Sequence, residues 1–405
     1  MVATPVNLSS VPKFKIRSEI LALQSNLVQW RRELHRWPEL GFKERRTAAF
    51  VQQKLSEWGI PHQGSIAQTG IVATITSTKP TGGRVMAIRA DMDALPIQEE
   101  NIVDYRSQID GLMHACGHDG HTAIALGTAF WLWQHRDSFR GTVKIIFQPA
   151  EEGPGGAKPM IEQGVLEHPR VEAIIGLHLW NNLPIGTVGV RSGALMAAVE
   201  SFTCTILGKG GHGAMPHQTV DSVLVAAQVV NALQTIVARN VDPLDSAVVT
   251  VGELHAGTKR NVIADKAKLN GTVRYFNPAL GNLIPQRLEQ VIAGVCQSHG
   301  AGYELDYQRL YPPVINDGAI AALVRSVAET VVETPAGVVP ECRTMGGEDM
   351  SFFLQEVPGC YFFVGAANPD KDLAYPHHHP RFDFDETALG TGVEIFVRCV
   401  EKFCR

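Results

Sequence analysis

The sequence predicts an α/β protein in which one domain, with a mixed sheet covered by helices, is interrupted by a second, ferredoxin-like domain of βαββαβ order. Short β-branched segments alternate with helical patterns in the first half of the chain, which is typical of a sheet with helices on its faces. From about residue 199 the order becomes strand, helix, two strands, helix and strand, as in a ferredoxin-like unit. After about residue 310 the first pattern returns, so we expect the first domain to resume there.

The first domain begins with two amphipathic helices and continues as alternating strands and helices. In chain order we predict helices over 21–34 and 44–55, strands over 70–76 and 85–89, a helix over 121–135, a strand over 143–147 and a short helix over 157–163, followed by an apolar run over 171–179. Ligands collect at the carboxyl ends of the strands in such sheets. Residues that follow these strands are therefore the first candidates for a functional site.

The inserted domain and the return to the first domain supply the remaining elements. We predict strands over 199–207, 247–254, 266–275, 303–309 and 361–365, and helices over 221–239, 280–298, 319–332 and 386–403. The domain boundaries follow from this order. Residues 1–195 and 311–405 form the first domain, and residues 196–310 form the inserted one.

The composition argues against several classes of function. The chain has 405 residues, and 45% of them are hydrophobic, which is enough for a sizeable core and excludes global disorder. Lys and Arg number 36 against 41 Asp and Glu, a formal charge of −5, so we expect neither nucleic acid nor an anionic membrane as partner. No secretory signal and no run of about 18 apolar residues is visible. The seven cysteines have no disulfide spacing, which favours a reduced, cytoplasmic protein.

Four short segments of the first domain concentrate residue types that bind metals. They are residues 113–121 (MHACGHDGH), 148–153 (QPAEEG), 176–179 (GLHL) and 376–380 (PHHHP). Each has a structural alternative, because a lone cysteine behaves as a small hydrophobe, and single histidines, paired glutamates or a histidine run can be core or surface residues. Their co-occurrence favours metal binding, since Cys, His and Glu are donors for ions such as zinc.

The number of donors favours two ions over one. A single tetrahedral ion needs three or four ligands. Here Cys116, His118, Glu152, His178 and one of residues 377–379 make five. Such a surplus suits two ions roughly 3.5–4 Å apart that share a ligand.

Seven segments, in order along nearly the whole chain, form a set that is highly specific in combination. They are RADMDALP (89–96), HACGHDGH (114–121), QPAEEG (148–153), GKGGHGAMPH (208–217), NVI (261–263), GTVR (271–274) and MGGEDM (345–350). This set resembles the M20 metallopeptidase family, and more narrowly its amidohydrolase branch, which includes hippurate hydrolase, N-acyl-amino-acid amidohydrolases and auxin-conjugate hydrolases. The resemblance implies a catalytic domain with a two-metal centre, interrupted by a lid domain that often mediates dimerisation.

The resemblance also implies the metal ligands. Cys116 corresponds to a bridging ligand, His118 and His178 complete one metal site, and Glu152 and His378 complete the other. The bridging cysteine is typical of the amidohydrolase branch, because other branches carry a carboxylate there. The implied cofactor is a pair of divalent ions, Mn²⁺ or Zn²⁺, with Ni²⁺ as a further option.

The family pattern is a histidine, one residue, then proline and an aromatic residue. His378 fits this pattern through Pro380 and Phe382. His377 is the nearest alternative ligand within the histidine run. This choice stays open at the level of the sequence.

The remaining matched positions imply catalysis and substrate binding. Glu151 corresponds to the general base, His212 in the lid domain to a stabiliser of the oxyanion, and Asp93 to a residue that orients a metal ligand. Three further positions correspond to substrate binders: Asn261, Arg274 and Gly347. Arg274 would bind a carboxylate, because a guanidinium holds a planar carboxylate through two hydrogen bonds.

The leading hypothesis is a metal-dependent amidohydrolase that cleaves N-acyl amino acids and forms a homodimer, or a higher homo-oligomer, through the lid domain. A metallocarboxypeptidase or dipeptidase on the same scaffold is the nearest alternative, because a peptide is also an acylated amino acid. A thiol hydrolase with Cys116 as nucleophile belongs to a different class. A non-catalytic metal-binding protein is the third alternative, and the presence of Glu151 argues against it.

Overall fold

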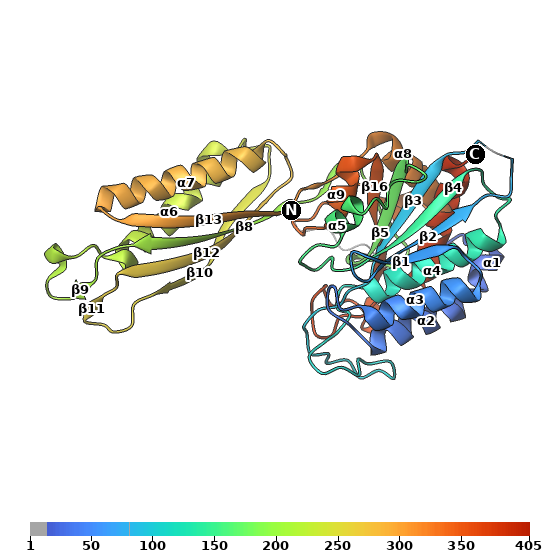
Figure 1. Cartoon of the computed structure of the whole chain (residues 1–405), viewed down its shortest axis with the longest axis horizontal. Helices are drawn as coiled ribbons and strands as arrows, with labels where there is room; N and C mark the ends of the chain where they lie inside the picture. The colour runs from blue at the N-terminus through green and yellow to red at the C-terminus, as the bar shows by residue number, and fades with distance from the viewer. Residues whose placement is uncertain (1–13, 81) are drawn as a thin grey trace. The chain divides into compact units, whose positions relative to one another are not determined.

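The computed structural model describes residues 14–80 and 82–405, which form two compact units. Unit 1 contains the described residues up to Gly193 together with Ile315–Cys342 and Phe352–Arg405. Unit 2 contains Ala194–Val314 and Arg343–Ser351. Both units contain helices and strands (Figure 1). The predicted α/β fold class is confirmed.

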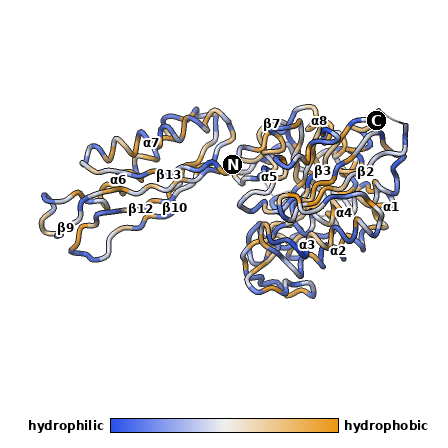
Figure 2. The backbone as a smooth tube through the Cα atoms, in the orientation of Figure 1, coloured by the Kyte–Doolittle hydropathy of each residue, from blue (hydrophilic) through white to orange (hydrophobic). Residues whose placement is uncertain are grey.

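Unit 1 is built on a mixed sheet of eight strands in the order β1-β2-β4-β3-β5-β16-β6-β15. The strands are β1 (His62–Ile66), β2 (Gly70–Thr76), β3 (Val85–Asp91), β4 (Thr142–Gln148), β5 (Ala173–Pro184), β6 (Val188–Gly189), β15 (Val338–Val339) and β16 (Gly359–Ala367). β3, β4, β5 and β16 run parallel, so their carboxyl ends share one edge of the sheet. Figure 2 shows hydrophobic residues concentrated along these central strands.

Unit 1 also contains helices, several of which pack on this sheet. They are α1 (Ser18–Leu21), α2 (Gln24–Arg36), α3 (Arg45–Glu57), α4 (His118–Gln134), α5 (Ala157–Glu162), α8 (Gly318–Val331) and α10 (Ala388–Phe403), and α9 (Met350–Glu356) begins at the boundary between the units. α2 and α3 both pack against α4 (Figure 1). α4 is buried over most of its length and also contacts α10. A helix that is apolar on all sides is a core helix, and α4 carries part of the candidate site at its first turn.

Unit 2 is a four-stranded antiparallel sheet in the order β10-β12-β8-β13. Its elements are β8 (Val199–Leu207), α6 (Ser222–Asn240), β10 (Ala247–Ala256), β12 (Lys266–Tyr275), α7 (Leu280–His299) and β13 (Gly302–Tyr311). This chain order is the predicted βαββαβ. A separate two-stranded ribbon, β9 (Gly211–His212) with β11 (Val262–Ile263), was not predicted. The short strands β7 (Gly193–Met196) and β14 (Val314–Asn316) lie where the chain passes between the units.

Within the described ranges, α6 is the one helix whose length and composition would allow it to cross a membrane. Its residues Val225, Val229 and Leu233 are buried in the core of unit 2. Core helices share this length and composition, so burial against the sheet accounts for the apolar face of α6.

Candidate metal centre

The candidate residues of unit 1 come from the edge at which the parallel strands end. Asp93 follows β3, Glu151 and Glu152 follow β4, and His178 lies in β5. α4 begins at His118, three residues before the predicted start. The turn before it has a φ of 94° at Gly117, a conformation that glycine adopts without steric cost.

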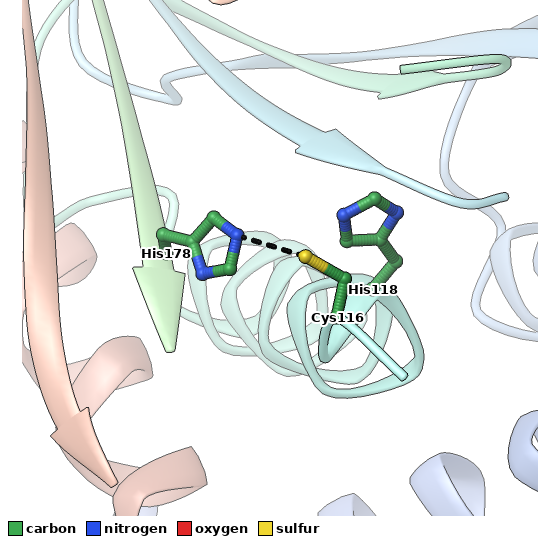
Figure 3. A group of neighbouring side chains, drawn as sticks. All are labelled: Cys116, His118 and His178. Atoms are coloured by element: carbon green, nitrogen blue, oxygen red, sulfur yellow. Dashed lines mark hydrogen bonds between the residues drawn. The ribbon is translucent and has the colours of Figure 1, made fainter. Parts of the chain in front are cut away.

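Cys116, His118 and His178 form the first group of metal-binding side chains. Their ligand atoms all lie within 4.8 Å of one another, and the three residues are buried. The Sγ atom of Cys116 is 3.4 Å from Nε2 of His178. Figure 3 shows Cys116, just before α4, pointing toward His178 on β5, with the ring of His118 on the other side of the sulfur.

Hydrogen bonds to carbonyl oxygens fix the tautomers of both histidines. Nδ1 of His178 donates to the carbonyl oxygen of Leu179 at 2.7 Å, and Nδ1 of His118 donates to that of Asp93 at 3.0 Å. A carbonyl can only accept, so each Nε2 is left to bind a ligand or a proton. Nε2 of His118 is buried and has no hydrogen-bond partner among the described residues. Burial and the neighbouring His121 hold the pKa of His178 well below its ordinary value, which keeps this ring neutral as a metal ligand must be.

Cys116, Glu152 and His378 form the second group, with ligand atoms again within 4.8 Å of one another. Nε2 of His378 lies 3.0 Å from Oε1 of Glu152. The backbone N–H of His378 donates to the carbonyl oxygen of Ala115 at 2.8 Å, which holds the histidine loop beside the cysteine. Cys116 therefore belongs to both groups, as a bridging ligand would.

The neighbouring His377 is used elsewhere. Its Nε2 donates to the carbonyl oxygen of Leu179 at 2.9 Å, and its ring stacks on Trp180 with centroids 4.5 Å apart. It belongs to none of the ligand groups found among the described residues. The structure therefore groups His378, and not His377, with the other donors.

Carboxylates surround the two groups and give the centre a negative charge. Burial opposes protonation of His118, but Asp91 and Asp93 outweigh it and raise its pKa to about 10. Burial, Glu152 and Glu151 raise the pKa of the Cys116 thiol well above its ordinary value. Buried negative charge of this density needs a compensating cation.

The side chains fit a pair of divalent ions. The two groups combine sulfur, imidazole and carboxylate donors, which suit borderline divalent metals. Nε2 of His118, which makes no hydrogen bond to any described residue, is the atom that such an ion would engage. Glu151 lies beside this nitrogen, with Oε2 at 4.0 Å.

Asp93 connects the ligands of the two groups. Its carboxylate accepts the backbone N–H of Glu151 through Oδ1 and that of Glu152 through Oδ2, both at 3.0 Å. Its carbonyl oxygen accepts from His118. These hydrogen bonds are compatible with the orienting role of Asp93, which stays a prediction.

Sequence reasoning left Asp91 and His121 without a role. Nδ1 of His121 donates to Oδ1 of Asp91 at 2.6 Å, and Nε2 accepts the backbone N–H of Leu179 at 2.8 Å. Both ring nitrogens are thereby used, so His121 fixes the segment of β5 next to His178. The signal in the sequence was the spacing of His118 and His121, which places them on one face of a helix.

Two of the predicted lid residues lie together in unit 2. His212 pairs with Val262 in the β9-β11 ribbon, and the adjacent Asn261 accepts the N–H of Gly213 through its carbonyl oxygen at 2.9 Å. Both side chains are exposed. Nδ1 of His212 accepts the N–H of Ala214 at 3.1 Å, so its Nε2 carries the proton and can donate.

Arg274 and Gly347 lie at the other end of unit 2. β12 advances eight residues from Lys266, near the ribbon, to Arg274, about 27 Å at ~3.4 Å per residue. The half-buried Arg274 has no carboxylate partner among the described residues; it donates to backbone carbonyls and to Thr272. A Cβ on Gly347 would lie 1.9 Å from Cγ2 of Val199, so this glycine allows the loop to pack on β8.

Comparison with known proteins adds an independent line of evidence. The model of the family described as peptidase family M20/M25/M40 matches residues 87–402. N-acyl-L-amino acid amidohydrolase of Geobacillus stearothermophilus is 46% identical over 305 residues, which cover 75% of this chain and 81% of the relative. Thermostable carboxypeptidase 1 of Saccharolobus solfataricus is 36% identical over 396 residues, which cover 96% of this chain and 98% of the relative.

A solved structure is similar over the same extent. The crystal structure of the Bacillus subtilis YXEP protein, described as a dinuclear metal-binding peptidase from the M20 family, has a TM-score of 0.82 and 36% identity and covers 95% of this chain and 99% of that one. The resemblance inferred from the motifs, and with it the prediction of a hydrolase, is thereby confirmed. The chain belongs to peptidase family M20/M25/M40.

Proposed function

We propose that this protein is a metal-dependent amidohydrolase that splits N-acyl amino acids into a carboxylic acid and a free amino acid. The observation that carries the proposal is that the Cys116 thiol belongs to two groups of metal-binding side chains, with Glu151 beside them. Hydrolysis at a two-ion centre needs a shared ligand and an adjacent base. The similar N-acyl-L-amino acid amidohydrolase supports this substrate class.

The two groups assign the ligands of each ion. Cys116, His118 and His178 would hold one ion, and Cys116, Glu152 and His378 the other. Two such ions, when bound, would lower the pKa of water toward 7 and polarise the scissile carbonyl. Mn²⁺ and Zn²⁺ are the proposed ions, with Ni²⁺ as a third option, because this mixed donor set does not select strongly among them.

Glu151 would accept a proton from the attacking water and deliver it to the leaving nitrogen. Its carboxylate reaches within 4.0 Å of Nε2 of His118, and its backbone is held by Asp93. Glu152 is engaged with His378 instead, so the two adjacent glutamates have different tasks. A positioned general base typically contributes ~10²–10⁴-fold to the rate.

Arg274 and His212 would act on the substrate from unit 2. Arg274 is suited to a substrate carboxylate, because its guanidinium is half-buried and has no acidic partner among the described residues. His212 would donate from Nε2 to the developing oxyanion, and Asn261 beside it would bind the substrate. Gly347 would let its loop approach the same substrate near Arg274.

The distance between His212 and Arg274 within unit 2 indicates that two copies of the chain form one active site. His212 lies on the ribbon beyond the Lys266 end of β12, and that end is about 27 Å from Arg274 at ~3.4 Å per residue. The two side chains are therefore too far apart to contact one small substrate from the same copy of the unit. We infer that His212 serves the centre of a second copy of the chain. A homodimer formed through unit 2 is the simplest assembly that meets this need.

A thiol hydrolase is the less supported alternative. A nucleophilic cysteine needs a lowered pKa, whereas burial and Glu152 raise that of Cys116. A metallocarboxypeptidase has better support, because thermostable carboxypeptidase 1 is similar over nearly the whole chain. It would use the same centre and differ only in the acyl group that it accepts.

The proposal is tested by metal content together with a panel of N-acetyl amino acids, N-benzoyl amino acids and dipeptides, assayed with added Mn²⁺ or Zn²⁺. We expect chelation to abolish hydrolysis of the N-acyl substrates and added metal to restore it. Activity that survives chelation, or an acyl-enzyme on Cys116 detected by mass spectrometry, would overturn the proposal. Faster turnover of dipeptides would favour the carboxypeptidase.

A further inference from the structure

The two glutamates of the proposed centre are adjacent, so the loop that carries them must bend. Successive residues of an extended strand point to opposite faces, yet Glu151 and Glu152 both approach the metal-binding groups. The bend lies at Ala150, whose φ is 55°. This left-handed conformation is disfavoured for a residue with a Cβ, so contacts outside the loop must hold it.

Two buried carboxylates hold three consecutive backbone N–H groups of this loop. The N–H of Ala150 donates to Oε1 of Glu44 at 2.8 Å. The N–H groups of Glu151 and Glu152 donate to the two oxygens of Asp93. Successive N–H groups that converge in this way form a concave anion site, and here the protein fills that site with its own side chains.

Glu44 is itself fixed in place from two sides. Its side chain is fully buried, and Oε2 accepts a hydrogen bond from the hydroxyl of Thr69 at 2.6 Å. The chain just before it lies against the bend, since a Cβ on Gly41 would be 2.9 Å from Cβ of Ala150. The carboxylate therefore has a single orientation toward the loop.

Capping of α3 does not account for Glu44. Although it is the residue just before the helix, its side chain makes no capping hydrogen bond. Glu39 takes that task, because its two oxygens accept the N–H groups of Arg46 and Thr47 at 3.1 and 2.9 Å. Burying a carboxylate without hydrogen-bond partners lowers the stability of the fold. The hydrogen bond from the N–H of Ala150 is one such partner for Glu44.

We propose that Glu44 is a positioning residue of the centre: its carboxylate holds the Ala150 N–H so that the loop presents Glu151 as base and Glu152 as ligand. The proposal rests on the function proposed above for these two glutamates. Glu44 lies 107 residues before Glu151 in the chain and belongs to none of the ligand groups.

Three variants distinguish a positioning role of Glu44 from a general contribution to the stability of the fold. Glu44→Ala removes the acceptor of the Ala150 N–H. Glu44→Gln keeps it, because an amide oxygen still accepts from Ala150 and the amide NH₂ can donate to Thr69. Glu39→Ala is the matched control, since it removes a carboxylate that accepts two backbone hydrogen bonds at the same helix terminus and makes no hydrogen bond to residues 150–152.

The first readout is amide hydrogen exchange of residues 150–152 in the metal-free protein. The second is a titration of metal-free protein with Co²⁺, whose visible spectrum reports the ligands. For Glu44→Ala we expect faster exchange at these amides and Co²⁺ affinity about tenfold or more weaker, the usual effect of removing a partner of a metal ligand. Glu44→Gln should keep both properties near those of the unaltered protein. Glu39→Ala should lower the melting temperature only.

The proposal is overturned if Glu44→Ala leaves exchange and Co²⁺ affinity unchanged, or if Glu39→Ala changes both to the same extent. Should Glu44→Ala fail to fold, Thr69→Val gives a second test, because it frees the carboxylate of Glu44 without removing it. A smaller change in the same direction supports positioning, and no change contradicts it.

Turnover gives a separate check. Loss of positioning should lower kcat of Glu44→Ala while KM changes little, because the substrate contacts remain. If the unaltered protein binds Co²⁺ but hydrolyses none of the amides in the panel, the proposed function fails. The exchange and affinity comparisons would still decide the role of Glu44.

Discussion

At the scale of single residues, the adjacent Glu151 and Glu152 are chemically identical but differ in their contacts. Glu152 meets His378 at 3.0 Å and Glu151 lies toward His118 at 4.0 Å. We predict that Glu151→Gln retains both ions and loses turnover by ~10²–10⁴-fold, whereas Glu152→Gln loses an ion. Metal analysis beside kcat measures the difference. Normal turnover in Glu151→Gln would reject the assignment of the base.

The two neighbouring histidines of the last loop make a second matched pair. We predict that His378→Ala binds one ion fewer or far more weakly, because a ligand is removed. His377→Ala should keep both ions, since its Nε2 is committed to the carbonyl of Leu179. It should lose stability instead, through its stacking on Trp180. Metal content and melting temperature of the two variants test this, and equal metal loss would contradict it.

Residues with a characteristic chemistry could be predicted from sequence, and so could the supporting Asp93 through the family resemblance, whereas other supporting residues could not. Cys116 and His178 carry donor types in segments that also match the family. Glu44 binds a loop residue 106 positions away in the chain, and His121 binds a residue of β5 that is 58 positions away. No local pattern identifies the group that either residue binds, because these contacts exist only after the strands have assembled.

At the scale of elements, a buried network of ion pairs and hydrogen bonds joins α2 to α4. Arg31 donates to Asp119 at 2.7 Å and to Asp383 at 2.8 Å, and His35 shares Asp119 at 2.8 Å while its other nitrogen lies 3.3 Å from Glu99. Asp119 follows His118 on the first turn of α4. Charges buried this deeply stabilise only as complete pairs, so the network fixes the position of the first turn of α4, which carries the proposed ligand His118.

This network gives a pH-dependent stability. Burial and Arg31 lower the pKa of His35, but Asp119 and Glu99 outweigh them and raise it to about 9, above its ordinary 6.5. A group whose pKa is higher in the folded state than in the unfolded state adds to the free energy of unfolding. This addition is complete at a pH below the unfolded-state pKa and is lost as the pH rises through the folded-state pKa. We predict that stability contributed by His35, up to about 3 kcal/mol, is lost between pH 6.5 and 9.

The measurement is the free energy of unfolding of metal-free protein against pH, for the unaltered chain and for His35→Gln. The difference between the two curves should shrink over this interval, because glutamine does not titrate. Curves that stay parallel from pH 6 to pH 10 would show that His35 is uncharged or that its charge does not stabilise the fold.

Helices and strands whose hydrophobic residues recur with a clear period were predictable from the sequence, whereas short, irregular elements were not. β8 alternates buried and half-exposed residues along its whole length, which is the period of a strand. The β9-β11 ribbon has only two residues per strand and leaves no period to detect. α4 begins three residues before its expected start because Gly117, and not a side-chain cap, ends the preceding loop.

At the scale of the whole molecule, the interrupted order of the chain separates the metal-binding groups from the lid residues. Cys116 and Glu151 lie in unit 1, while His212 and Arg274 lie in unit 2. The chain enters and leaves unit 2 at its Arg274 end, because β8 begins and β13 ends there. His212 lies at the opposite end, on the ribbon beyond β8 and β12. Catalysis that uses both residues therefore cannot draw them from one copy of unit 2.

This argument predicts complementation between two inactive variants. Glu151→Gln lacks the base but keeps His212, and His212→Ala keeps the base. If His212 serves the centre of a second copy, mixed dimers contain one centre with both groups intact. We expect activity to return when the two variants are unfolded together, mixed and refolded, and not when each is refolded alone. Arg274→Ala mixed with Glu151→Gln is the control, because Arg274 would act on the centre of its own chain and no complete centre can form. Recovery in the control but not in the test pair would reverse the assignment of the two residues, and recovery in neither would place His212 on the centre of its own chain.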